Sequence, residues 1–175
     1  MKRTLILTAL LLLIATAPLS SNNLNPTPDN QQTDKRIPEL DQYWTKLSKT
    51  VREGDFEGYS SLYHKDAVII FTTGSNKVSV AVAEALAGWK QGFAKTKAGE
   101  QKDNVEFRFS QRIGNANTAH ETGIFHFTSV DNSGKTLTDI LVHFEMLFVK
   151  KDGVWLSTME YQKSTATQAE WEALN

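Results

Sequence analysis

The spacing of apolar residues predicts helices in the first half of the chain. Between residues 38 and 53 apolar side chains recur every three or four positions, after an initial proline and before Gly54, which is typical of an amphipathic helix. Asp55 is a suitable cap for a second, short helix, and residues 80–94 repeat the helical spacing in a third. A β-branched run at residues 67–71 predicts a strand between the second and third helices.

Beyond residue 104 apolar and polar residues alternate instead, which indicates strands with one buried face. Turn-forming residues at 131–134 and 151–153 join the later strands as hairpins. Strands are expected at residues 105–110, 117–130, 136–150 and 153–163. Thr167 and Glu170 have capping-box spacing, so a last short helix is expected to carry Trp171 onto the body or onto a neighbour. The order predicts an α+β domain, with the helices on one face of a curved antiparallel sheet.

The first residues have the composition of a secretory signal peptide. Lys2 and Arg3 precede an apolar run at residues 5–17, which is too short to span a bilayer of about 30 Å as a helix. We therefore expect a signal peptide over residues 1–20, cleaved after Ala17 or near Ser20, and an exported protein, periplasmic or extracellular. No stable membrane anchor is expected after cleavage, and an uncleaved anchor is the alternative.

Residues 21–36 are rich in Asn, Pro, Thr, Asp and Gln and almost free of apolar side chains. Such a segment buries too little apolar surface to offset the entropy lost on ordering, which predicts a disordered linker. The folded domain is then expected over residues 37–175.

Composition excludes several classes of function. Across 175 residues, 19 basic side chains face 20 acidic ones, so no positive excess exists for binding nucleic acid, and none is expected as a partner. The chain has no cysteine, which excludes disulfides, zinc–thiolate sites and thiol nucleophiles. Its four histidines lack metal-ligand spacing, and no phosphate-binding loop or nucleophile elbow is present. We expect neither a metal nor a cofactor.

Several short segments carry a family resemblance, at residues 51–56, 62–68, 142–145 and 153–155. With the order of elements, they make residues 40–163 similar to the nuclear-transport-factor-2-like superfamily, which includes ketosteroid isomerases and SnoaL-type polyketide cyclases. The resemblance implies a cone-shaped fold, in which a bent antiparallel sheet curls around three N-terminal helices and leaves a pocket between them, and often a face-to-face dimer. It does not fix a chemistry.

The resemblance also allows a comparison of catalytic positions. Ketosteroid isomerases use a tyrosine, a proton-moving aspartate and a donor acid, and the matching positions here hold Leu47, Phe71 and Val142. The resemblance therefore does not extend to that isomerase chemistry, and any catalysis would need other residues.

Alternation assigns side chains to the two faces of the sheet. An apolar row from Ile140 to Phe148 is expected to face the helices, together with Glu121 and Glu160 from the neighbouring strands. Two such carboxylates in an apolar pocket are candidate catalytic acids and bases, because burial raises a carboxyl pKa. The alternative is that each lies in water at the rim or pairs with Arg108 or Arg112. The expected ligand-binding residues are Tyr59, Tyr63, Trp89, Phe125, Val142, Phe144, Thr158 and Gln162.

The opposite, semi-polar face is expected to pair two subunits in a homodimer through His126, His143, Glu145 and Tyr161. Three functions remain open. The first is an exported domain that binds a small apolar molecule. The second is a cofactor-free lyase, cyclase or isomerase that uses Glu121 and Glu160 with Tyr59 or Tyr63 as donor. The third is a protein-interaction module with a filled, pocketless cone.

Overall fold

A computed structural model describes residues 35–75 and 77–174 of the chain. The chain divides at residues 31 and 32 into two units, and the described residues all belong to the second. The expected signal peptide lies outside the described residues, as does all of the expected linker except Lys35 and Arg36. Arg36 is the first residue of helix α1, so the helix begins two residues before the predicted start.

Three helices form one layer, namely α1 (Arg36–Glu53), α2 (Phe56–Ser60) and α3 (Val82–Lys97). Gly54 ends α1 with a φ of 63°, and a Cβ there would lie 2.4 Å from the backbone nitrogen of Lys97. Only glycine allows this left-handed turn and this close approach to α3. The Asp55 side chain then caps α2 by accepting a hydrogen bond from the Gly58 backbone nitrogen at 2.9 Å.

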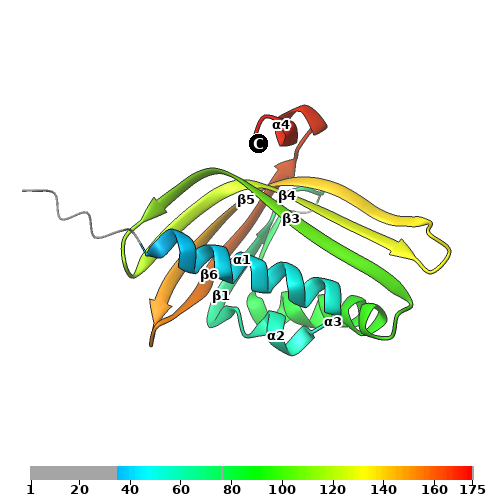
Figure 1. Cartoon of the computed structure of the whole chain (residues 1–175), viewed down its shortest axis with the longest axis horizontal. Coiled ribbons are helices and arrows are strands. Elements are labelled where there is room, and N and C mark those ends of the chain that lie inside the picture. The colour runs from blue at the N-terminus through cyan, green and yellow to red at the C-terminus, as the bar shows by residue number, and fades with distance from the viewer. Residues whose placement is uncertain (1–34, 76, 175) are drawn as a thin grey trace, which may run out of the picture. The chain divides into compact units, whose positions relative to one another are not determined.

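The second layer is a six-stranded sheet in the order β2-β1-β6-β5-β4-β3. Its strands are β1 (Tyr63–Phe71), β2 (Val78–Ala81), β3 (Gln101–Gly114), β4 (Thr118–Asp131), β5 (Thr136–Lys151) and β6 (Val154–Thr165). Neighbours are antiparallel except β1 and β6, which run parallel. Edge strand β2 occupies residues that the sequence assigned partly to the third helix. The sheet curves around the three helices (Figure 1), which confirms the predicted fold class.

Among the bulges of the sheet, one in β3 and one in β6 change which side chains face the helices near the two candidate acids. In β3 the pairing skips Ser110, so Phe109 and Arg112 both point inward. In β6 it skips Thr158, because Phe148 pairs with Ser157 whereas Leu147 pairs with Met159. A bulge inserts one residue and reverses the alternation beyond it.

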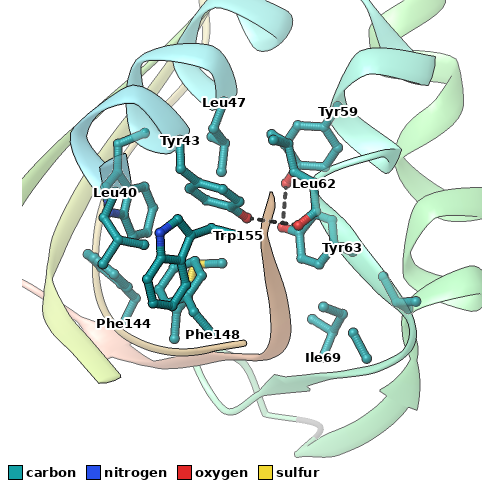
Figure 2. Packing of buried hydrophobic residues seen from close by; sticks show 14 of the residues in the cluster. Leu40, Tyr43, Leu47, Tyr59, Leu62, Tyr63, Ile69, Phe144, Phe148 and Trp155 are labelled. Atoms are coloured by element: carbon teal, nitrogen blue, oxygen red, sulfur yellow. Dashed lines mark hydrogen bonds between the residues drawn. The ribbon is translucent and has the colours of Figure 1, made fainter. Parts of the chain in front are cut away.

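The main core lies between the helices and the concave face of the sheet. Trp44 of α1 packs against the rings of Phe107 and Phe144, with centroids 4.4 and 5.5 Å away. Tyr43 meets Phe148 edge to face at 5.0 Å, and Figure 2 shows both among other buried residues of this cluster. This dense aromatic packing holds α1 against the sheet.

A short C-terminal helix, α4 (Gln168–Glu172), lies on the opposite face of the sheet from the three other helices (Figure 1). Its predicted capping box between Thr167 and Glu170 is present. Trp171 is buried beside Ile124, and the Arg108 guanidinium lies 4.1 Å from its ring. Trp171 thus packs onto the body of its own chain.

No helix among the described residues is long and apolar enough to cross a membrane.

Candidate functional site

A cavity of about 480 Å³ lies between the helices and the concave face of the sheet. This volume falls in the range of small-molecule sites. Most of the lining is apolar, and its aromatic rings are those of Tyr59, Tyr63, Trp89, Phe93, Phe107, Phe125, Phe127 and Phe144. Leu137 and Ile140 also line it and are 51% and 42% exposed, so the cavity opens to solvent beside them.

Glycines on one face of α3 help to leave this space empty. Gly88 and Gly92 are one helical turn apart, and both line the cavity. A Cβ at either position would meet no atom within 4 Å. Glycine destabilises a helix by nearly 1 kcal/mol relative to alanine, so the sequence pattern alone indicates that these two residues destabilise α3. The structure shows instead that they border open space.

A chain of hydrogen bonds at the buried end of the cavity converges on Glu160. The Tyr63 hydroxyl donates to one Glu160 carboxylate oxygen at 2.5 Å, and the Gln162 amide nitrogen donates to the other at 2.8 Å. The Tyr59 hydroxyl lies 3.0 Å from that of Tyr63, and Figure 2 shows the two hydroxyls facing each other. Tyr59 comes from α2, Tyr63 from β1, and Glu160 and Gln162 from β6, yet all four side chains line one cavity.

Burial sets the electrostatics of this cluster. It raises the pKa of Glu160 above the usual range, and the hydrogen bonds from Tyr63 and Gln162 offset only part of that rise. Burial, with the nearby Glu160 carboxylate, also raises the pKa of Tyr63 and Tyr59 well above that of a free phenol. The tyrosines therefore remain neutral hydrogen-bond donors, and Glu160 can hold a proton at a higher pH than a solvated glutamate does.

Glu121, the second candidate acid, is fully buried but does not line the cavity. Its carboxylate accepts hydrogen bonds from the Trp44 indole at 2.6 Å and from the Arg112 guanidinium at 2.7 Å. Arg112 also donates to Asp41 at 2.6 Å, and these partners raise the guanidinium pKa although burial opposes its charge. This is the pairing with Arg112 that the sequence left open as the alternative to catalysis. These contacts favour a structural role for Glu121.

Six of the eight expected ligand-binding residues line the cavity, namely Tyr59, Tyr63, Trp89, Phe125, Phe144 and Gln162. Val142 and Thr158 do not. Val142 is buried opposite Phe125, whose larger ring forms the wall there. Thr158 is the bulged residue of β6, and its hydroxyl donates to the Leu147 carbonyl oxygen at 3.2 Å. The same bulge turns Trp155 and Ser157 inward, although simple alternation places them outside.

The expected dimer face is partly occupied by the chain's own C-terminal helix. The His126 ring lies 5.7 Å from that of Trp171, and His143 lies 3.3 Å from the Glu170 carboxylate. Glu145 pairs instead with Lys163, and Tyr161 lies beside Thr72. Two of the four residues are therefore in contact with α4.

Three polar residues that the sequence pattern did not predict also line the cavity. Asp103, Ser129 and Thr138 pair across β3, β4 and β5, and all line the cavity. Asp103 accepts hydrogen bonds from Thr96 at 2.7 Å and from Gln101 at 2.9 Å. Residues 101–104 are all polar, so no alternation of apolar and polar residues marked them as part of β3.

Among the described residues no three acidic or histidine side chains come together as metal ligands.

Comparison with known families places this geometry in context. Residues 40–167 match the SnoaL-like domain, nearly three quarters of the chain. The chain belongs to the SnoaL-like domain family. This confirms the resemblance to the nuclear-transport-factor-2-like superfamily. Comparison with curated proteins gives no match.

Solved structures agree on the fold of this SnoaL-like domain. A conserved protein from Planctomyces limnophilus has a TM-score of 0.62 at 16% identity, covering 75% of this chain and 97% of its own. An NTF-2-like protein of unknown function from Shewanella oneidensis has a TM-score of 0.57 at 16% identity, covering 74% and 99%. A ketosteroid isomerase-like protein from Erwinia carotovora has a TM-score of 0.56 at 12% identity, covering 77% and 98%. At such identities the likeness shows the fold alone.

Proposed function

We propose that this chain binds a small, largely apolar molecule in the cavity, with the polar end of that molecule held at Glu160. The observation that carries the proposal is the cavity of about 480 Å³, lined by aromatic rings and by one buried cluster of polar groups. Apolar walls with a few fixed polar groups are the usual composition of a ligand site. The SnoaL-like fold supports a small-molecule-binding or isomerase-type domain.

Thermal unfolding with a library of neutral aromatic compounds tests the binding. A ligand at about 100 times its dissociation constant stabilises the folded state by about 2.7 kcal/mol. Gly92→Leu should abolish the stabilisation because its side chain enters the cavity. Ala94→Leu is the matched control, since Ala94 is exposed on the same helix and does not line the cavity. No binder in the library, or equal binding by both variants, would contradict the proposal.

A second candidate function is a cofactor-free lyase, cyclase or isomerase in which Glu160 moves a proton. The observation that favours it is the raised pKa of Glu160 beside the Tyr63 hydroxyl donor, inside the cavity. Glu121 takes no part in this version, because Arg112 and Trp44 hold it outside the cavity. Carbon-13 NMR titration of the Glu160 carboxyl tests it. A value near the ordinary 4.3 or so of a solvated glutamate would discard it.

The third reading, a protein-interaction module with a filled cone, loses support because the cone encloses the cavity. A pure interaction module has no use for an empty, aromatic-lined interior.

We further propose that the chain acts outside the cytoplasm, after removal of a signal peptide near residue 20. The basic start and the apolar run at residues 5–17 support this. N-terminal sequencing of the protein recovered from cell fractions tests it. Cytoplasmic protein that retains Met1 would contradict it.

A homodimer through the outer face of the sheet stays a proposal, supported by the half-exposed Leu147 beside Glu145. Helix α4 covers part of this face, so an interface would have to include α4 or lie beside it. Light scattering across a concentration series tests the proposal, and a monomer throughout would contradict it.

A further inference from the structure

Of the residues that the structure describes, the ionisable side chains that line the cavity are acids or neutral tyrosines, and none is a base. Glu160 and Asp103 line it, and no Lys, Arg or His does so within the described part of the chain. Arg112 pairs with Glu121 and Asp41 instead. A buried carboxylate normally has a cationic partner, because an unpaired buried charge is costly. Glu160 has only neutral donors.

The directions of the hydrogen bonds leave acceptors facing the cavity. When Glu160 is ionised, the single hydroxyl hydrogen of Tyr63 goes to its carboxylate, so Tyr59 must donate to Tyr63. Gln162 likewise donates its amide hydrogen to Glu160, which leaves the Gln162 carbonyl oxygen as an acceptor. A carboxylate has room for about four hydrogen bonds, and these contacts use two. The cluster therefore calls for a further donor from the ligand.

The aromatic walls near this cluster suit a positive charge. The Tyr59 ring lies 4.9 Å from that of Phe93 and 5.9 Å from that of Trp89, and all three line the cavity. Ring faces attract an ammonium group, the more so where water is excluded. An anion would meet the Glu160 carboxylate and these ring faces without any compensating positive charge.

We propose that the ligand is a lipophilic amine, with its ammonium group bound at the Glu160 carboxylate and its apolar body among the aromatic rings. This inference rests on the proposed binding function and names the ligand class of the same cavity. Carboxylates and phosphates are excluded by charge. A neutral alcohol with the same apolar body binds more weakly, because it supplies a donor but no charge.

Matched ligands separate this inference from the binding function itself. Calorimetry at pH 7.5 compares an ethylamine, an ethanol and an acetate, each attached to phenyl, naphthyl and anthracenyl bodies. With the aromatic body that fits the cavity, the amine should bind at least tenfold more tightly than the alcohol, and the acetate should not bind measurably. This series uses the unmodified protein, so it does not depend on any variant folding.

Glu160→Gln removes the charge and keeps the shape. The variant should reduce the amine preference over the alcohol to about twofold or less, while alcohol binding persists. Glu106→Gln is the matched control, since Glu106 is exposed on β3 and does not line the cavity, and it should leave the preference unchanged.

Each remaining outcome has one meaning. Acetate binding as tightly as the amine, or a preference that survives Glu160→Gln, would overturn the amine inference and leave the binding function standing. If no compound of the series binds and the wider neutral library also fails, both proposals fall.

Discussion

Replacing Glu121 by Gln removes the charge from a carboxylate with no exposed surface. The Trp44 indole and the Arg112 guanidinium both donate to this carboxylate, so three elements of the fold meet there: α1, β3 and β4. Glutamine keeps one acceptor oxygen but directs an NH₂ group at a donor. The variant therefore tests whether Glu121 is structural.

The expected cost follows from the contacts. A hydrogen bond to a charged group contributes about 1.5–3 kcal/mol, and removing one partner of a buried ion pair costs about 3–5 kcal/mol. Asp41 still pairs with Arg112 from the solvent side, which moderates the loss. We expect Glu121→Gln to lower the free energy of unfolding by about 3 kcal/mol, or Tm by about 10 °C for a domain of this size.

Urea titrations of Glu121→Gln, Arg112→Met and the double variant measure this. Because each single change already removes the Glu121–Arg112 ion pair, the double variant should lose less than the sum of the two. Binding of a cavity ligand should be unchanged in any variant that folds, since neither residue lines the cavity. A stability loss below about 1 kcal/mol together with loss of binding would refute this assignment.

Three further outcomes are expected. Burial raises the pKa of Glu160 in the folded chain above the roughly 4.3 of the unfolded chain. The contribution of this side chain to the free energy of unfolding is therefore full below a pH of about 4.3, and it declines as pH rises through the pKa of the folded chain. Glu160→Gln should therefore gain stability relative to the unmodified protein as pH rises from 4 to 8 in urea titrations, and a constant difference would contradict the burial. Gly92→Ala should raise the free energy of unfolding by up to about 1 kcal/mol, because the new Cβ meets open space. Gly54→Ala should lower it by more than about 1 kcal/mol, because φ is 63° and the new Cβ would meet the α3 backbone. Equal shifts in Tm for the two variants would contradict both predictions. Trp171→Ala should cost about 3 kcal/mol and expose the amides around Ile124 to hydrogen exchange, and a cost under about 0.5 kcal/mol would mean that α4 does not dock.

Local signals predicted most of the elements. The helical spacing and Gly54 defined α1, and the Thr167–Glu170 capping box defined α4, because each depends on residues within a few positions of one another. Alternation also placed Glu121 and Phe144 on the buried face correctly. Helix α3 was less well predicted, since the β-branched residues just before Val82 form an edge strand that pairs with β1.

The site required information that lies beyond local sequence. The bulge at Thr158 depends on how β6 pairs with β5, and it moved Thr158 out of the inner row and Trp155 into it. The separation of the two acids also depended on tertiary contacts, since Arg112 reaches Glu121 only through the pairing of β3 with β4. Whether a cone is hollow depends on how well its side chains fill it, and no periodicity encodes that.

Methionine methyl NMR tests the central claim, that the cavity receives a small molecule, most directly. Met146 lines the cavity, whereas Met159 lies on the same sheet outside the lining. With ¹³C-methyl methionine, titration of the protein with a naphthyl ligand should shift the Met146 methyl resonance in a saturable way through the ring current, and leave Met159 unmoved. A Met146 resonance that stays fixed at saturating ligand, or a shift at Met159 alone, would contradict the account.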